Sequence, residues 1–119
     1  MIITKIHALQ SLKPTGEWTW TGTAYSSLNW LDSSTKPTES EIDAEVTRLT
    51  NAEPMRLLRV ERNAKLAACD WRASSDVTLP DAWKTYRQAL RDLPASANPT
   101  VDSNGELNTS SVTWPTEPS

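Results

Sequence analysis

The sequence predicts an α+β fold built from three successive parts. Alternating apolar and polar residues near the start indicate a small antiparallel β-sheet or hairpin. Apolar residues at helical spacing in the middle indicate a long or kinked helix followed by a helical hairpin. The last part is rich in Pro, Ser and Thr and indicates an extended tail. We assign residues 1–32 to a β-rich segment, 38–94 to a helical module and 95–119 to the tail.

The N-terminal segment contains three runs that are typical of strands. Residues 2–7 alternate as Ile-Ile-Thr-Lys-Ile-His, and a turn at Pro14-Thr15-Gly16 follows. The next run places Trp18 and Trp20 on one face, and residues 24–30 continue the pattern. Two or three such strands form a sheet too thin to stand alone, so we expect a helix or a partner over the Trp face.

A first helix is predicted to begin after the polar linker at residues 33–37. Thr38-Glu39-Ser40-Glu41 fits a capping box, in which Thr38 and Glu41 satisfy each other's backbone N–H groups. Ile42, Val46 and Leu49 follow at i, i+4 and i+7, which forms an apolar stripe.

Pro54 leaves two alternatives for the next stretch. Proline inside a helix removes a hydrogen bond and costs about 3 kcal/mol, whereas in a first turn it costs little. The sequence Asn51-Ala52-Glu53-Pro54 suits a break and restart. We therefore predict helices over about 38–51 and 54–70, or one kinked helix.

The helix over 54–70 carries a basic stripe formed by Arg56, Arg59, Arg62 and Lys65. A solvated face and a partner-binding face both explain this spacing. Arginine favours the binding interpretation slightly, because its planar fork suits carboxylates and interfaces.

A further helix is predicted after the start signal at residues 78–81. Trp83, Tyr86 and Leu90 form its apolar stripe, and Pro94 is expected to stop it. The two helices can pair antiparallel across a loop at 72–78, with Trp71 and Trp83 near the corner. We expect Trp83 and Leu90 to be buried, and Arg87 or Arg91 to pair with Asp70 or Asp76. The structural module comprises Asp70, Trp71, Trp83, Tyr86, Arg87, Leu90 and Arg91.

The composition indicates a protein that works by binding. Only 37% of the 119 residues are hydrophobic, and there are six Trp but no Phe. Trp is enriched at binding hot spots, although it also fills cores. We favour core positions for Trp71 and Trp83 and leave both interpretations open for the other four. The candidate partner-binding residues are Trp18, Trp20 and Trp30, expected to be exposed, with Arg59, Arg62 and a terminal hook at Trp114 and Pro115.

Other function classes lack their chemistry here. A net charge of −3 argues against nucleic acid as a partner. His7 is the single histidine, Cys69 the single cysteine and the three Gly are isolated, so no catalytic triad, metal-ligand spacing, phosphate loop or cofactor site is expected. The start lacks a signal-peptide pattern, and no stretch approaches a membrane span. We expect a soluble, cytosolic protein that is not an enzyme.

Residues 28–118 resemble bacteriophage tail assembly chaperones and tail fibre assembly proteins. The resemblance rests on Arg59-x-x-Arg62-Asn63, Asp70-Trp71, the run Trp83-x-x-Tyr86-Arg87-Gln-Ala-Leu90-Arg91-Asp-Leu-Pro94, and Trp114-Pro115. A second, weaker part is Trp30-Leu-Asp with Lys36-Pro-Thr38.

The resemblance implies a non-enzymatic helper that binds a phage tail fibre protein in the host cytoplasm during assembly. Fibres of this kind are long β-rich trimers with non-local contacts, which makes their assembly slow and prone to aggregation. A trimeric partner also raises the prospect of self-association as a trimer. The alternative is a permanent virion component that caps or connects the tail fibre.

Overall fold

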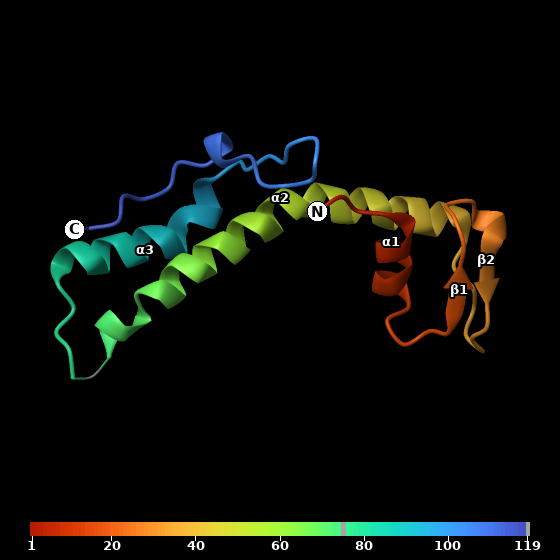
Figure 1. Ribbon diagram of the computed structural model, residues 1–119, viewed down its shortest axis with the longest axis horizontal. Coiled ribbons are helices and arrows are strands. Elements are labelled where there is room, and N and C mark those ends of the chain that lie inside the picture. The colour runs from red at the N-terminus through yellow and green to blue at the C-terminus, as the bar shows by residue number, and fades with distance from the viewer. Residues whose placement is uncertain (75, 119) are drawn as a thin grey trace. The chain divides into compact units, whose positions relative to one another are not determined.

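The computed structural model describes residues 1–74 and 76–118 (Figure 1). The chain divides into two compact units, Met1–Ala52 and Glu53–Ser119. In chain order the elements are α1 (Lys5–Leu12), β1 (Trp18–Trp20), the 3-10 turn η1 (Tyr25–Ser27), β2 (Leu28–Trp30), α2 (Glu39–Ala68), η2 (Asp70–Ala73), α3 (Asp81–Ser96) and η3 (Thr109–Ser111). The α+β class predicted from the sequence is confirmed.

The predicted antiparallel hairpin is present as a two-stranded sheet. Trp18 pairs with Trp30, and Trp20 pairs with Leu28. Because side chains alternate along a strand, these four residues share one face of the sheet. The strand predicted over 24–30 is shorter, since η1 occupies residues 25–27.

The strand predicted over residues 2–7 is wrong, because α1 begins at Lys5. The Thr4 side chain accepts a hydrogen bond from the His7 backbone N–H, and the Thr4 N–H donates to His7 Nδ1 at 2.9 Å. This is a capping box with histidine in place of the usual Glu or Gln. The periodicity of this short apolar run fits either a strand or a helix, and the capping box stabilises the helix.

A first core lies between α1, the sheet and the first turns of α2. Ala8 and Leu9 of α1, Leu28 of β2 and Ile42 of α2 are buried. The side chains packed around them are Leu12, Trp18, Trp20, Tyr25, Trp30, Val46 and Leu49. The cover that the thin sheet requires is therefore supplied by helices of this chain.

Of the two alternatives for Pro54, the single helix is correct, and the predicted restart at residue 54 is wrong. Helix α2 runs unbroken from Glu39 to Ala68 with Pro54 inside it. The Glu41 N–H donates to Thr38 Oγ1 at 3.1 Å, which is one of the two hydrogen bonds of the predicted capping box. A proline inside a helix removes one hydrogen-bond donor. Leu58, four residues after Pro54, is fully buried, and the free energy gained from its burial favours continuing the helix.

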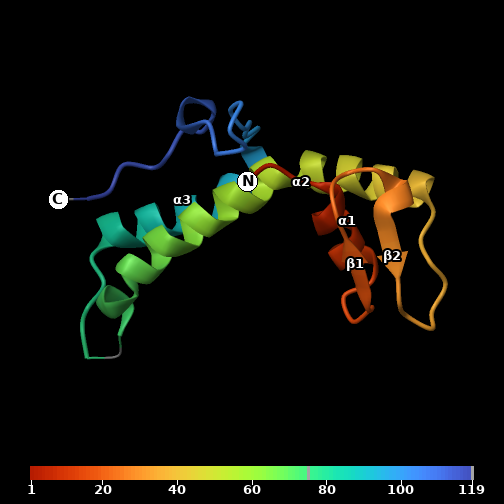
Figure 2. The same cartoon turned by 45° about the vertical axis from the view of Figure 1, so that its right-hand side comes forward.

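In the C-terminal unit, the last turns of α2 and helix α3 lie side by side as an antiparallel pair (Figures 1 and 2). Their second core consists of Cys69, Trp83, Tyr86 and Leu90. The Trp83 and Tyr86 rings meet edge to face, with centroids 5.6 Å apart. Helix α3 ends at Ser96, so the stop predicted at Pro94 is two residues too early. The missing N–H of Pro94 costs one hydrogen bond near the helix end, where the cost is small.

The tail after α3 has local structure of its own. Val101 and Leu107 form a β-bridge across a turn in which Gly105 has φ +76°, a conformation that glycine adopts readily. Val112 is buried, and Trp114 packs against the second core. Over the described residues, no helix has both the length and the apolar character needed to span a membrane.

Candidate partner-binding surfaces

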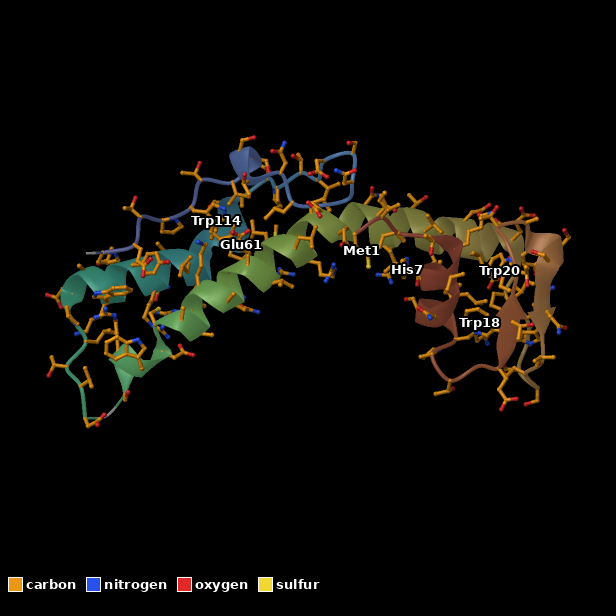
Figure 3. All side chains as sticks on the ribbon, viewed as in Figure 1. Met1, His7, Trp18, Trp20, Glu61 and Trp114 are labelled. Atoms are coloured by element: carbon orange, nitrogen blue, oxygen red, sulfur yellow. The ribbon has the colours of Figure 1, made fainter. Side chains whose placement is uncertain are left out.

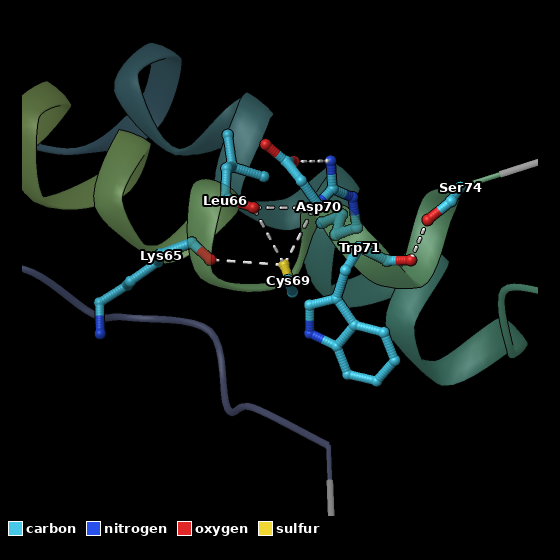
Figure 4. Close-up of polar contacts among 7 residues, drawn as sticks. Lys65, Leu66, Cys69, Asp70, Trp71 and Ser74 are labelled. Atoms are coloured by element: carbon cyan, nitrogen blue, oxygen red, sulfur yellow. Dashed lines mark hydrogen bonds and ion pairs between the residues drawn. The ribbon is translucent and has the colours of Figure 1, made fainter. Parts of the chain in front are cut away.

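The guanidinium group of Arg87 connects the end of α2 to α3. Arg87 Nη1 donates to the Leu66 carbonyl at 3.0 Å and to Cys69 Sγ at 2.9 Å, and Nη2 donates to Asp70 Oδ1 at 2.8 Å (Figure 4). The ion pair with Asp70 raises the pKa of Arg87 above its ordinary value. This is one of the pairings predicted from the sequence. A cation from α3 thus satisfies a carbonyl at the negative end of the α2 dipole.

Trp71 is the large aromatic side chain that this arrangement leaves open to solvent. It is 58% exposed, and its ring projects away from the Arg87 network (Figure 4). The core position predicted for it is wrong, because α2 ends at Ala68 and the η2 turn rotates Trp71 off the packed face. The core position predicted for Trp83 holds, since Trp83 is only 5% exposed.

Arg72 lies between these two tryptophans. Its guanidinium carbon is 4.4 Å from the Trp71 ring centroid and 4.0 Å from the Trp83 ring centroid. Both distances are within cation–π range. The exposed Trp71 is therefore tied, through Arg72, to a ring in the second core.

The predicted basic stripe does not act as one surface. Arg56 pairs with Glu53 at 2.6 Å, which lowers the pKa of Glu53. Arg62 donates to Asn63, and Lys65 lies over the ring of Trp114. Arg59 is exposed. Arg59 is therefore the stripe residue best placed to meet a partner.

The three tryptophans of the sheet are half-buried rather than exposed, so that expectation is corrected. Trp20 Nε1 donates to the Ala24 carbonyl at 3.0 Å, and Trp30 Nε1 donates to the Ser34 carbonyl at 2.8 Å. Trp18 packs against the first core with them. Their rings point into the N-terminal unit, and Figure 3 shows Trp18 and Trp20 there. The remaining module residue, Arg91, is exposed and donates to Gln88.

The C-terminal hook, residues 113–118, is held chiefly by one side chain. Trp114 lies between the tail and the α2–α3 pair (Figure 3), packs on the second core, and has Lys65 Nζ 5.2 Å from its ring centroid. Its Nε1 is buried and has no acceptor among the described residues. Residues 113–118 make no hydrogen bond to any of the residues that the structure describes. Pro115 is half-buried beside Trp114.

The described residues hold no group of three His, Cys, Asp or Glu side chains placed to bind a metal. His7 caps α1, and the thiol of Cys69 is buried and donates to the carbonyls of Lys65 and Leu66. These groups have structural roles. The arrangement offers apolar and cationic contact surface.

Sequence reasoning missed two residues that shape these surfaces. The sequence places Arg72 in a loop and Lys65 in a basic stripe, and in the structure each makes a cation–π contact with a tryptophan. The adjacency of Trp71 and Arg72 in the sequence was a usable signal for the first. No local signal links Lys65 to Trp114, which lies 49 positions later.

Comparison with known protein families gives a match over the C-terminal unit. A family model described as phage tail assembly chaperone protein matches residues 55–119, which is more than half of the chain and nearly all of the C-terminal unit. No curated protein and no solved structure matches the chain.

Proposed function

Since this chain belongs to the phage tail assembly chaperone family, we propose that its client is a tail fibre protein, bound through the C-terminal unit while the fibre assembles. Chaperones of this kind act by binding and are in general not enzymes. The fibre is favoured over other tail components by the resemblance at residues 28–118, which includes tail fibre assembly proteins. A chaperone that covers apolar fibre surface before the trimer forms would keep the fibre chains from aggregating.

The observation that carries the proposal is the exposed, pre-oriented ring of Trp71. A tryptophan that is 58% exposed is a typical binding hot spot. Its stacking on Arg72, which itself stacks on the buried Trp83, restricts the rotamers of the ring. A partner then loses less side-chain entropy when it binds there. Val77, 41% exposed in the same connection between α2 and α3, adds apolar contact area.

Secondary contacts are proposed at the positions named from the sequence. Arg59 supplies an exposed cation on α2, and Arg62 lies one turn further along. Trp18, Trp20 and Trp30 contribute only through their exposed edges. If the fibre is trimeric, its symmetry would present three equal sites, so we expect up to three copies per fibre.

The test is co-expression of the fibre protein with the wild-type chaperone or with a Trp71→Ala variant. We expect Trp71→Ala to weaken fibre binding about 10- to 30-fold, the effect of losing a hot spot of 1.4 to 2 kcal/mol, and to lower the yield of soluble fibre. The thermal stability of the chaperone should change little, because the side chain is exposed.

Val60→Ala is the matched control, since Val60 is 56% exposed on the same unit. It should leave the fibre yield close to wild type. Equal soluble fibre with and without the chaperone would contradict the proposal. Mass spectrometry of purified virions then tests the structural alternative, which requires the protein in a fixed ratio to the fibre.

A further inference from the structure

The C-terminal hook covers part of the second core through contacts that another chain segment can replace. Trp114 contributes its ring to a cluster whose other members come from the end of α2 and the residue after it, from α3 and from the segment just before α3. The hook brings no backbone hydrogen bonds with it, within the described residues. Segments held by few contacts and no hydrogen bonds open at low free-energy cost.

The fit of Trp114 is also incomplete. Its indole N–H is buried without an acceptor, although a buried donor normally has a partner. Trp20 and Trp30 in the N-terminal unit donate to backbone carbonyls instead. Trp114 therefore gains apolar contact and the Lys65 stacking, but loses the hydrogen bond that its N–H made to water.

The chemistry of the covered face can be read from its present occupant. Lys65 favours an aromatic ring, and the second core favours a large apolar side chain. Burial raises the pKa of Tyr86, and the negative charge of nearby Glu117 adds to the rise. The face accepts an extended chain with an aromatic residue followed by proline.

We infer that the hook is a built-in competitor for the client: the face under Trp114 binds an extended, aromatic-bearing segment of the tail protein, and the hook must leave first. The inference rests on the proposed function and adds a second contact surface with its own regulation. Because the hook is tethered, its effective concentration is high, and only a client that fits better displaces it. Until a client arrives, the hook therefore protects this apolar face of the second core from non-specific association.

The first experiment uses the hook itself as the probe. A fluorescein-labelled peptide with the sequence of residues 109–118 is titrated into the full-length wild type, Trp114→Ala and Thr116→Ala. Thr116 is exposed in the same segment and serves as the matched control. We expect Trp114→Ala to bind the peptide at least tenfold more tightly than wild type, because the internal competitor is lost. Thr116→Ala should match wild type, and a peptide with Ala at the position of Trp114 should bind none of the proteins.

Circular dichroism checks that the helices persist in Trp114→Ala. If that variant does not fold, Pro115→Gly replaces it, because glycine makes the free hook more flexible and shifts it off the face while keeping Trp114. The expected gain in peptide affinity is then about two- to fivefold. Affinities within a factor of 1.5 of wild type for the folded variants would overturn the inference and identify the hook as a fixed part of the core.

The second experiment replaces the peptide with purified fibre protein. Trp114→Ala should bind the fibre protein several-fold more tightly than wild type, and the hook peptide should compete. If the peptide binds the opened face but the fibre affinity stays unchanged, the client does not use this face and the inference fails. The proposed function is tested separately by Trp71→Ala and the soluble fibre yield. The inference about the hook and the proposed function can therefore be refuted independently of each other.

Discussion

Arg87 offers a test of what holds the helical pair together. Its side chain is only 13% exposed and makes contacts to Leu66, Cys69 and Asp70 at 2.8–3.0 Å. The hydrogen bond from a charged donor to the Leu66 carbonyl contributes about 1.5–3 kcal/mol. The ion pair contributes less, up to about 1 kcal/mol, because Asp70 is 63% exposed and screened by water.

These magnitudes predict an unequal outcome for the two partners of the ion pair. Arg87→Ala should lower the free energy of unfolding by about 2–4 kcal/mol, including the packing of its aliphatic stem. Asp70→Asn should lower it by about 1 kcal/mol or less. Adding salt should weaken the Asp70 contribution and leave the carbonyl contact largely unchanged.

The assay is urea unfolding followed by circular dichroism, with the double variant completing a mutant cycle. Arg91→Ala is the control, because Arg91 lies one turn further on α3, is exposed and, among the residues that the structure describes, bonds only to Gln88. It should change stability by less than about 0.5 kcal/mol. If Asp70→Asn costs as much as Arg87→Ala, the ion pair and not the helix-end contact holds the two helices, and our reasoning is refuted.

Two further predictions concern the cores. Leu90 is fully buried, so Leu90→Ala should cost about 2–5 kcal/mol and lower the melting temperature, whereas an unchanged melting temperature would mean that the α3 stripe is not core. In the N-terminal unit, hydrogen bonds from Arg48 and then Ser11 lower the pKa of Glu45 below its ordinary 4.5. Glu45 therefore binds its proton more weakly in the folded state, so its stabilisation is complete above about pH 4.5 and is lost as the pH falls through the lower folded value. Urea midpoints at pH 6, 4.5 and 3 should fall less steeply for Glu45→Gln than for wild type, and parallel curves would count against this role.

The elements that the sequence predicted well are those with a strong local signal. The apolar stripe of α3 and the cap at Thr38 each depend on residues a few positions apart, and both are found in the structure. The Trp18–Trp20 strand is similar, because its alternation is flanked by turn residues. The pairing of Arg87 with Asp70 was predictable because the helical hairpin brings their ends together.

The failures have different physical causes, and competition between local preference and packing explains the first of them. Pro54 predicts a break locally, yet α2 continues because burial on both sides of it offsets the lost hydrogen bond. The N-terminal run was ambiguous, and a histidine in the capping position is not a recognised sequence signal. Helical periodicity predicts a core position for Trp71, but the helix ends three residues before it. The contact of Trp114 with Lys65 depends on tertiary structure alone.

The position of Trp114 in the chain also sets the order in which the protein can be completed during translation. The residues of the first core and those packed around them lie within the first 49 positions, so that unit can form while the rest is being made. The second core receives its last member 24 residues after Leu90. The helices of the C-terminal unit are therefore complete in sequence before Trp114 is made, and the hook is the last segment that can join them.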